Sequence, residues 1–173
     1  MEKNWTIRKR RLEDQESFAG MLAKSWLDTY VNQDLDIDKE WIEGVSRFRK
    51  ERDTDEKIAA TLGNNDWRYL VAVDKDGEVI GGSVQKVLPV NEQDLQALYI
   101  DKSYKGSGLA QDFMKEIMNG FDVLKPITLG VATYNDRAKA FYLKYNFKEV
   151  PGSETKFLDK IPEIKMIRKG DKK

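Results

Sequence analysis

A short glycine-containing loop is the feature of this 173-residue chain that most clearly suggests ligand binding. Gly106 and Gly108 lie between a strand predicted over residues 95–100 and a helix predicted to begin at Leu109. Glycine adopts positive φ without strain and lets the backbone approach a ligand closely. The first N–H groups of a helix have no intrahelical acceptor, and they carry the positive end of the helix dipole. With Lys105 as an added charge, the loop is predicted to hold a pyrophosphate, although a simple tight turn also accounts for the two glycines.

Two common phosphate-binding motifs do not fit this loop. A P-loop has its lysine after the glycines, whereas Lys105 precedes them. The dinucleotide fingerprint needs a third glycine, and Gln111 stands at that position. The loop also follows predicted antiparallel strands instead of opening a βαβ unit, so a different phosphate-binding architecture is indicated.

Composition excludes several other kinds of chemistry. The chain has no cysteine and no histidine, which rules out thiol nucleophiles, Cys/His zinc sites and histidine-containing catalytic triads. Its 30 basic and 30 acidic residues balance, which is untypical of nucleic-acid-binding proteins. The longest apolar run, residues 69–73, is too short to span a membrane, and the N-terminus has no apolar signal region. We expect no metal, no nucleic-acid partner, no membrane partner and a cytoplasmic location.

Hydrophobic periodicity predicts the elements that position the loop. Apolar residues spaced by three and four predict helices over 12–30, 37–48, 58–62 and 109–121, and one that begins near residue 135. Short apolar runs predict strands over 6–9, 69–73, 79–88, 95–100, 126–131, 147–150 and 164–168. An antiparallel meander followed by a β-α-β crossover predicts an α/β fold with a mixed sheet and helices on both faces. We expect a single domain over residues 1–170 and a frayed tail over 171–173.

The loop and a second block resemble the GNAT superfamily of N-acetyltransferases. The family's acetyl-CoA loop reads Arg/Gln-x-x-Gly-x-Gly/Ala, and residues 105–110 match it with lysine in the first position. Residues 135–147 are similar to the family's Asn-x-x-Ala-x-x-Phe-Tyr-x-x-x-Gly-Phe, with Asn146 in the glycine place. Asparagine tolerates the left-handed conformation expected there, so this replacement is physically mild. The resemblance covers about residues 95–150.

The resemblance implies a splayed, mostly antiparallel sheet whose strands 95–100 and 127–131 separate to receive acetyl-CoA. It implies acetyl transfer to a primary amine by direct attack in a ternary complex. The backbone of Leu98 and Ile100 would bind the pantetheine. Asn135 would contact the CoA, and it also fits a purely structural role as a helix N-cap. The acetyl-CoA-binding residues implied in this way are Leu98, Ile100, Lys105, Gly106, Ser107, Gly108, Leu109, Ala110, Asn135 and Tyr142.

Three residues are implied in catalysis. Tyr142 matches the family's tyrosine that protonates the departing thiolate, with a core aromatic as the alternative interpretation. The N–H of Leu98 is the candidate donor to the tetrahedral oxyanion. Asp94 is the candidate general base, with Glu92 or an ordered water as alternatives.

The acceptor site is predicted in the first helix pair. Trp26, Tyr30 and Asp34 can line an acidic, aromatic pocket that suits a small cationic amine. The same aromatic residues can instead form the core of the helix pair while the acids face solvent. Residues 153–166 are loosely similar to bacterial polyamine acetyltransferases. A protein or peptide N-acetyltransferase, and an acyl-CoA-binding module without turnover, remain open alternatives, and a homodimer is possible.

Overall fold

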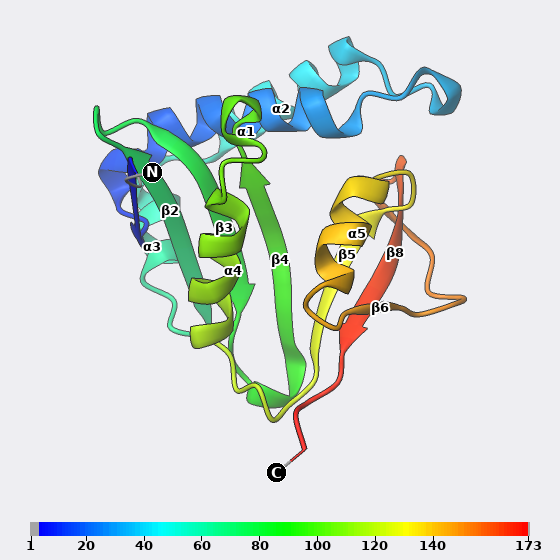
Figure 1. Ribbon diagram of the computed structural model, residues 1–173. Helices are drawn as coiled ribbons and strands as arrows, with labels where there is room; N and C mark the ends of the chain where they lie inside the picture. Colours follow the sequence, from blue (N-terminus) through cyan, green and yellow to red (C-terminus); the bar gives the residue numbers. More distant parts are fainter. Residues whose placement is uncertain (1–3, 173) are drawn as a thin grey trace.

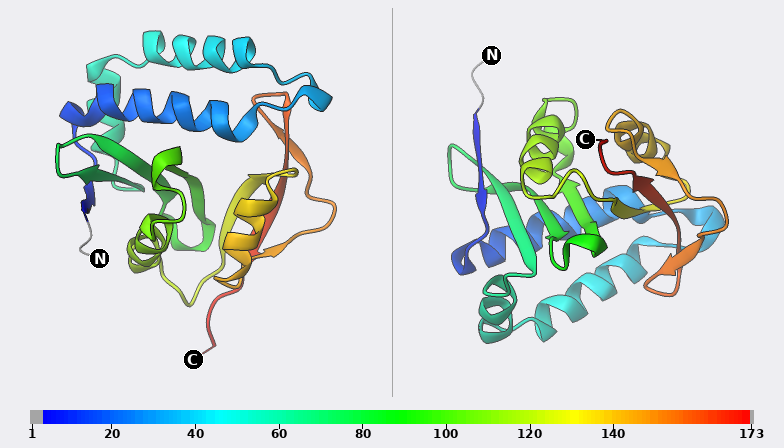
Figure 2. Two further views of the ribbon diagram at one scale, coloured as in Figure 1. Left: turned by 45° about the horizontal axis from the view of Figure 1, so that its top comes forward. Right: turned by 90° about the horizontal axis from the view of Figure 1, so that it is seen from below.

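The computed structural model describes residues 4–172, which form one eight-stranded sheet with helices on both faces (Figures 1 and 2). The strands are β1 (Trp5–Lys9), β2 (Trp67–Asp74), β3 (Val79–Lys86), β4 (Gln93–Ile100), β5 (Ile127–Ala132), β6 (Lys148–Glu149), β7 (Thr155–Phe157) and β8 (Ile161–Arg168). The helices are α1 (Gln15–Tyr30), α2 (Lys39–Arg52), α3 (Asp55–Leu62), α4 (Leu109–Asn119) and α5 (Asp136–Leu143). Figure 2 shows α1, α2 and α3 on one face of the sheet and α4 and α5 on the other.

The sheet has the order β1-β2-β3-β4-β5-β8-β6, and β7 pairs with β8. The β4–β5 pair is parallel, and the other strand pairs in residues 4–172 are antiparallel. Only Gln93–Leu95 of β4 pair with Ile127–Leu129 of β5, after which the two strands diverge (Figure 1). The predicted mixed, mostly antiparallel and splayed sheet is therefore confirmed.

Core packing fixes the first turn of α4, the helix that follows the glycine loop. Leu109, Phe113, Met114 and Ile117 are completely buried and recur at the spacing of one helix face. Burying a side chain of this size contributes about 1.5–3 kcal/mol. Because Leu109 is the first residue of α4, this packing fixes the helix N-terminus beside the diverging strands.

A second core joins α1 and α2 to the opposite face. Trp26 and Tyr30 of α1 are buried with Ile37 and Ile42, and they contact Ala132 and Ile161 of the sheet. Trp26 and Tyr30 are thus core residues of the helix pair, which is one of the two interpretations that the sequence allowed. Their packing holds α1 over the strands that separate.

The structure departs from the predicted elements mainly near the C-terminus. Strand β8 begins at Ile161, three residues before the predicted start, because its first residues pair with β7. It includes Pro162, whose carbonyl accepts the Thr133 N–H at 2.9 Å. The short strand β7 was not predicted. Asp171 of the expected tail pairs with Arg168 at 2.6 Å, while residue 173 lies outside the described residues. No helix within residues 4–172 is long and apolar enough to cross a membrane.

Candidate active site

The divergence of β4 and β5 opens a wedge-shaped cavity of about 460 Å³. Its walls come from both strands, from the loop that follows β4, and from α5. Asp94, Leu98 and Ile100 of β4 line it, as do Asn135 and Tyr142. The cavity therefore collects residues from both blocks that resembled the acetyltransferase motifs.

The unpaired edge of β4 presents backbone groups to this cavity. Asp101 donates its N–H to Ile80 of the neighbouring strand β3 at 2.9 Å, and Ile100 and Leu98 pair in register with Gly81 and Ser83. Successive residues of a strand direct their backbone polar groups to opposite edges. Leu98 and Ile100 therefore direct theirs toward the wedge, where the Ile100 carbonyl accepts a hydrogen bond from the Ser25 hydroxyl at 3.4 Å. This orientation supports the predicted backbone contacts.

The loop before α4 has the conformation that its glycines suggested. Gly106 and Gly108 have φ of 88° and 98°, and a Cβ on either would meet no atom within 4 Å. The glycines are thus needed for backbone conformation, and they leave open space beside the first turn of α4. Ser107 shapes the loop, because its hydroxyl donates to the Tyr104 carbonyl at 2.7 Å and accepts the Leu109 N–H at 3.3 Å. Of the predicted loop residues, Lys105, Gly106 and Ala110 line the cavity.

Two cations reinforce the electrostatics of this end of the cavity. Lys105 and Arg137 both line it. Burial, and secondarily the charge of Arg137, lower the pKa of Lys105. Lys105 contacts the carboxylate of Asp28 on α1, and Lys102 approaches the same carboxylate at 3.1 Å. Positive charge, free helix N–H groups and open space make this end suited to phosphate groups.

Tyr142 is held by packing and has a free hydroxyl within residues 4–172. Its side chain is buried against Phe141 and Phe147, with ring centroids 5.5 and 5.9 Å away. Burial raises the pKa of the hydroxyl well above its usual value, so the group is protonated at neutral pH, as an acid must be. Asn135 caps α5 by accepting the Ala138 N–H at 3.1 Å, so its structural role is present together with its place in the cavity wall.

Asp94 stands where the strands part. It accepts hydrogen bonds from the Gln96 amide at 2.7 Å and from the Thr128 hydroxyl. Burial raises its pKa, and these two hydrogen bonds oppose the rise. Glu92, the alternative base, lies outside the cavity and pairs with Lys86 at 2.8 Å on the surface.

Glu163 of β8 is a cavity residue that the sequence analysis did not single out. It lines the same cavity, and its pKa is raised by burial and by the charge of Asp94. A Cβ on Gly130 of β5 would lie 3.1 Å from Glu163 Oε2, so this glycine gives the carboxylate its space. The one sequence signal for this site was a carboxylate, Glu163, next to a predicted strand, together with a glycine, Gly130, inside another predicted strand.

The two carboxylates lie on the face of the sheet that α1 and α2 cover. Glu163 pairs with Ala132, and directly opposed residues share a face. Ala132 packs against Trp26 and Tyr30 of α1, while α4 and α5 lie on the other face (Figure 2). Asp94 shares the face of Glu163, because it pairs with Thr128 two positions before Gly130. The carboxylates and the glycine loop that precedes α4 thus approach the wedge from opposite faces.

The three residues predicted to bind the acceptor do not lie in one cavity. The Tyr30 hydroxyl lies 2.7 Å from that of Tyr99, and Tyr30 lines the wedge. Trp26 packs beside them but does not line this cavity. Asp34 is exposed in the loop between α1 and α2 and lines neither this cavity nor the second one described below.

Comparison with known proteins agrees with this geometry. The family model described as "Acetyltransferase (GNAT) domain" matches residues 32–169. The "Uncharacterized N-acetyltransferase YhbS" of Escherichia coli K12 is 27% identical over 146 residues, covering 73% of this chain and 83% of its own.

Solved structures share the fold over nearly the whole chain. The PaiA N-acetyltransferase of Thermoplasma acidophilum, in complex with coenzyme A, superposes with a TM-score of 0.73 at 25% identity. That alignment covers 96% of this chain and 99% of the other. A point mutant of the SpeG spermidine N-acetyltransferase from Vibrio cholerae gives a TM-score of 0.66 at 16% identity, covering 96% of this chain and 94% of its own.

Proposed function

Because the chain belongs to the GNAT family of acetyltransferases, we propose that it acetylates a small primary amine by direct attack in a ternary complex. It is an N-acetyltransferase with acetyl-CoA as co-substrate, and the acceptor is the open question. The observation that carries the proposal is the wedge itself. An unpaired strand edge, a positive-φ glycine loop and two carboxylates converge there from three parts of the chain.

The residues of the wedge fit acetyl-CoA. Leu98 and Ile100 offer backbone groups to an extended pantetheine chain. The loop at Gly106 and Gly108 offers open space beside the α4 N-terminus, with Lys105 and Arg137 as nearby cations for the phosphates. Acetyl-CoA supplies the acetyl group as a thioester, which an amine can attack without further activation.

The acceptor amine must lose a proton before it can attack. We propose Asp94, with Glu163 beside it, as the groups that attract the ammonium and accept that proton. Both are carboxylates that line the wedge, and burial raises the pKa of both. A raised pKa makes a carboxylate a better general base near neutral pH. The reacting end of the acceptor is therefore cationic when it arrives.

Two further groups act on the acetyl carbon and the leaving sulfur. The Leu98 N–H, on the open edge of β4, donates to the oxygen as it becomes negative, and a preplaced donor lowers the barrier. Tyr142, protonated and facing the cavity, donates its proton to the departing thiolate.

A thiol-release assay over amines and peptides tests the proposal. We expect acetyl-CoA to bind by calorimetry and small primary amines to release CoA. Turnover of peptides alone would indicate a protein acetyltransferase, and binding without turnover would indicate a non-catalytic module. Failure of acetyl-CoA to bind would overturn the proposal.

A further inference from the structure

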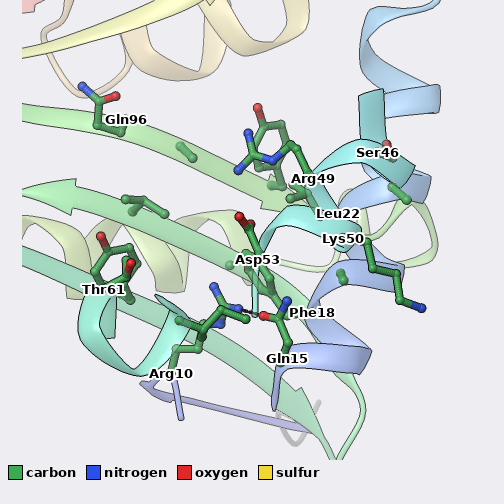
Figure 3. A pocket seen from close by; sticks show the side chains of 18 of the residues that line it. Arg10, Gln15, Phe18, Leu22, Ser46, Arg49, Lys50, Asp53, Thr61 and Gln96 are labelled. Atoms are coloured by element: carbon green, nitrogen blue, oxygen red, sulfur yellow. Dashed lines mark hydrogen bonds between the residues drawn. The ribbon is translucent and has the colours of Figure 1, made fainter. Parts of the chain in front are cut away.

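A second cavity of about 390 Å³ lies beneath α1, α2 and α3 on the face that carries the two carboxylates (Figure 3). It adjoins the wedge, since Gln96, Ala97, Tyr99 and Phe157 line both cavities. Its volume is within the range of small-molecule sites. Aromatic and aliphatic side chains such as Phe18, Leu22 and Trp26 form much of the wall. An acceptor whose amine lies in the wedge and which reaches past these shared residues would place its other end in this space.

The charge of this second cavity is strongly basic. Its ionised lining residues are Arg10, Arg49, Lys50, Arg52, Lys57 and Asp53. Arg52 already pairs with Asp53, the one acid among them, at 2.8 Å. Figure 3 shows Arg10 and Arg49 turned into the cavity, while Lys50 points away from it. Within residues 4–172 neither Arg10 nor Arg49 has a carboxylate within ion-pair distance.

The cavity also holds unused hydrogen-bond donors. Within the described chain, the buried side-chain polar atoms without a hydrogen-bond partner are Arg10 Nε and Trp26 Nε1. Both belong to residues that line this cavity, and both are N–H donors that cannot accept. Trp26 is only 2% exposed. Burial raises the pKa of Tyr99, and the Trp26 indole N–H interacts with the Tyr99 hydroxyl strongly enough to oppose that rise, although the geometry falls short of a full hydrogen bond. A buried donor without an acceptor is unfavourable, so the partner that Arg10 Nε lacks is an acceptor.

Aromatic rings hold the two arginines in place. The Arg10 guanidinium lies 3.9 Å above the Phe18 ring, and that of Arg49 lies 5.2 Å from the Trp26 ring. Such stacking leaves the edges of a guanidinium, where its N–H groups point, available to an anion. One guanidinium N–H of Arg10 donates to the Gln15 side chain. Burial lowers the pKa of Arg10, and the charges of Asp14 and Asp53 oppose this shift without cancelling it. An acid group entering here would oppose it further.

We infer that the second cavity holds the acid group, a carboxylate or a phosphate, of a small acceptor whose amine lies in the wedge at Asp94 and Glu163. This inference rests on the proposed function and names the substrate class. The acceptor is then an amine with a remote anionic group. A polyamine would instead place its second ammonium among the arginines, where like charges repel.

Matched amines test this charge preference. The thiol-release assay compares γ-aminobutyrate with butylamine, O-phosphoethanolamine with ethanolamine, and spermidine as the cationic case. We expect the acid-bearing amine of at least one pair to have a kcat/KM about tenfold or more above that of its neutral partner. The pair that gains more distinguishes carboxylate from phosphate. Equal turnover within both pairs, or preference for spermidine, would overturn the inference while leaving acetyl transfer intact.

Arg49→Gln links the preference to this cavity. Loss of a hydrogen-bonded charge partner is expected to raise KM for the acid-bearing amine about tenfold to a hundredfold. KM for acetyl-CoA and turnover of the neutral amine should not change. Arg47→Gln is the matched control, since Arg47 lies on the same helix, is exposed, and lines neither cavity. Equal effects of the two substitutions would contradict the assignment.

A binding measurement keeps the inference separate from turnover. The chain has four tryptophans, so a two-dimensional NMR spectrum of the CoA-saturated protein resolves few indole N–H signals, and Trp26→Phe identifies the signal of Trp26. Succinate or inorganic phosphate should shift that signal, and Arg49→Gln should abolish the shift. If both anions leave it in place, the inference is wrong whatever the assay gives. If CoA does not bind, the proposed function fails, and the same titration of the free protein still decides the anion site.

Discussion

Replacing Tyr142 by phenylalanine separates its chemical role from its packing role. The substitution keeps the ring that packs against Phe141 and Phe147 and removes only the hydroxyl. That hydroxyl makes no hydrogen bond to another residue of the described chain, so no buried partner loses its bond. We therefore expect the free energy of unfolding to change by less than about 1 kcal/mol.

The catalytic effect should be larger than the effect on stability. General acid catalysis contributes about 10²–10⁴-fold, and the CoA thiolate leaves fairly well even unprotonated. We therefore expect kcat for thiol release to fall at least about tenfold, which corresponds to about 1.4 kcal/mol in the barrier. Acetyl-CoA affinity measured by calorimetry should stay the same.

Two further variants complete the test. Tyr142→Ala removes a ring that is only 8% exposed and should destabilise the protein by about 3–5 kcal/mol, measured by urea unfolding. Tyr145→Phe is the matched control, because Tyr145 packs on Phe141 but does not line the wedge. A Tyr142→Phe enzyme with full kcat would refute the acid role and leave the residue as part of the core.

Three other predictions address the remaining parts of the site. Gly108→Glu should weaken acetyl-CoA binding at least about tenfold more than Gly108→Ala in calorimetry; both carry the same strain at positive φ, so equal losses would mean that charge is irrelevant. Because burial raises the pKa of Glu163, kcat/KM should fall on acidification at a higher pH than for an exposed carboxylate. Glu163→Gln should lower kcat/KM and move this acid limb, and an unmoved limb would remove Glu163 from proton transfer. Asp34→Asn should leave KM for the amine within about twofold, since Asp34 is exposed and lines neither cavity; a clear rise for cationic amines alone would restore it to the acceptor site.

The parts of the site that the sequence predicted are those that local patterns specify. The loop at Gly106 and Gly108 could be placed because a strand, two glycines and an amphipathic helix follow one another within a few residues. The capping role of Asn135 and the position of Tyr142 follow from helix spacing in the same way. Each of these features depends on neighbours in the chain, and the structure confirms the elements that carry them.

The second cavity could not be predicted because it depends on how distant elements meet. Arg10 follows β1, and Arg49 lies on α2, so their approach to one space depends on α2 and α3 covering the sheet. In the sequence both residues look like ordinary solvated charges. The acidic residues near Asp34 were more conspicuous, yet they lie in an exposed loop. Charge density along a chain thus says little about the charge of a cavity.

Glu163 shows how apolar burial can place a charged side chain in a cavity. Ile164 and Met166 of β8 are buried in the core beneath α4 and α5, whereas Glu163 and Lys165 line the wedge. A shift of one residue in the pairing with β5 would exchange the two faces of β8. It would expose two apolar side chains, each worth about 1.5–3 kcal/mol when buried, and would put two charges into the core at a further cost. The hydrophobic residues therefore enforce the register, and that register pairs Glu163 with Ala132. The Glu163 carboxylate then reaches over Gly130 on the same face, where the missing side chain leaves room for it beside Asp94.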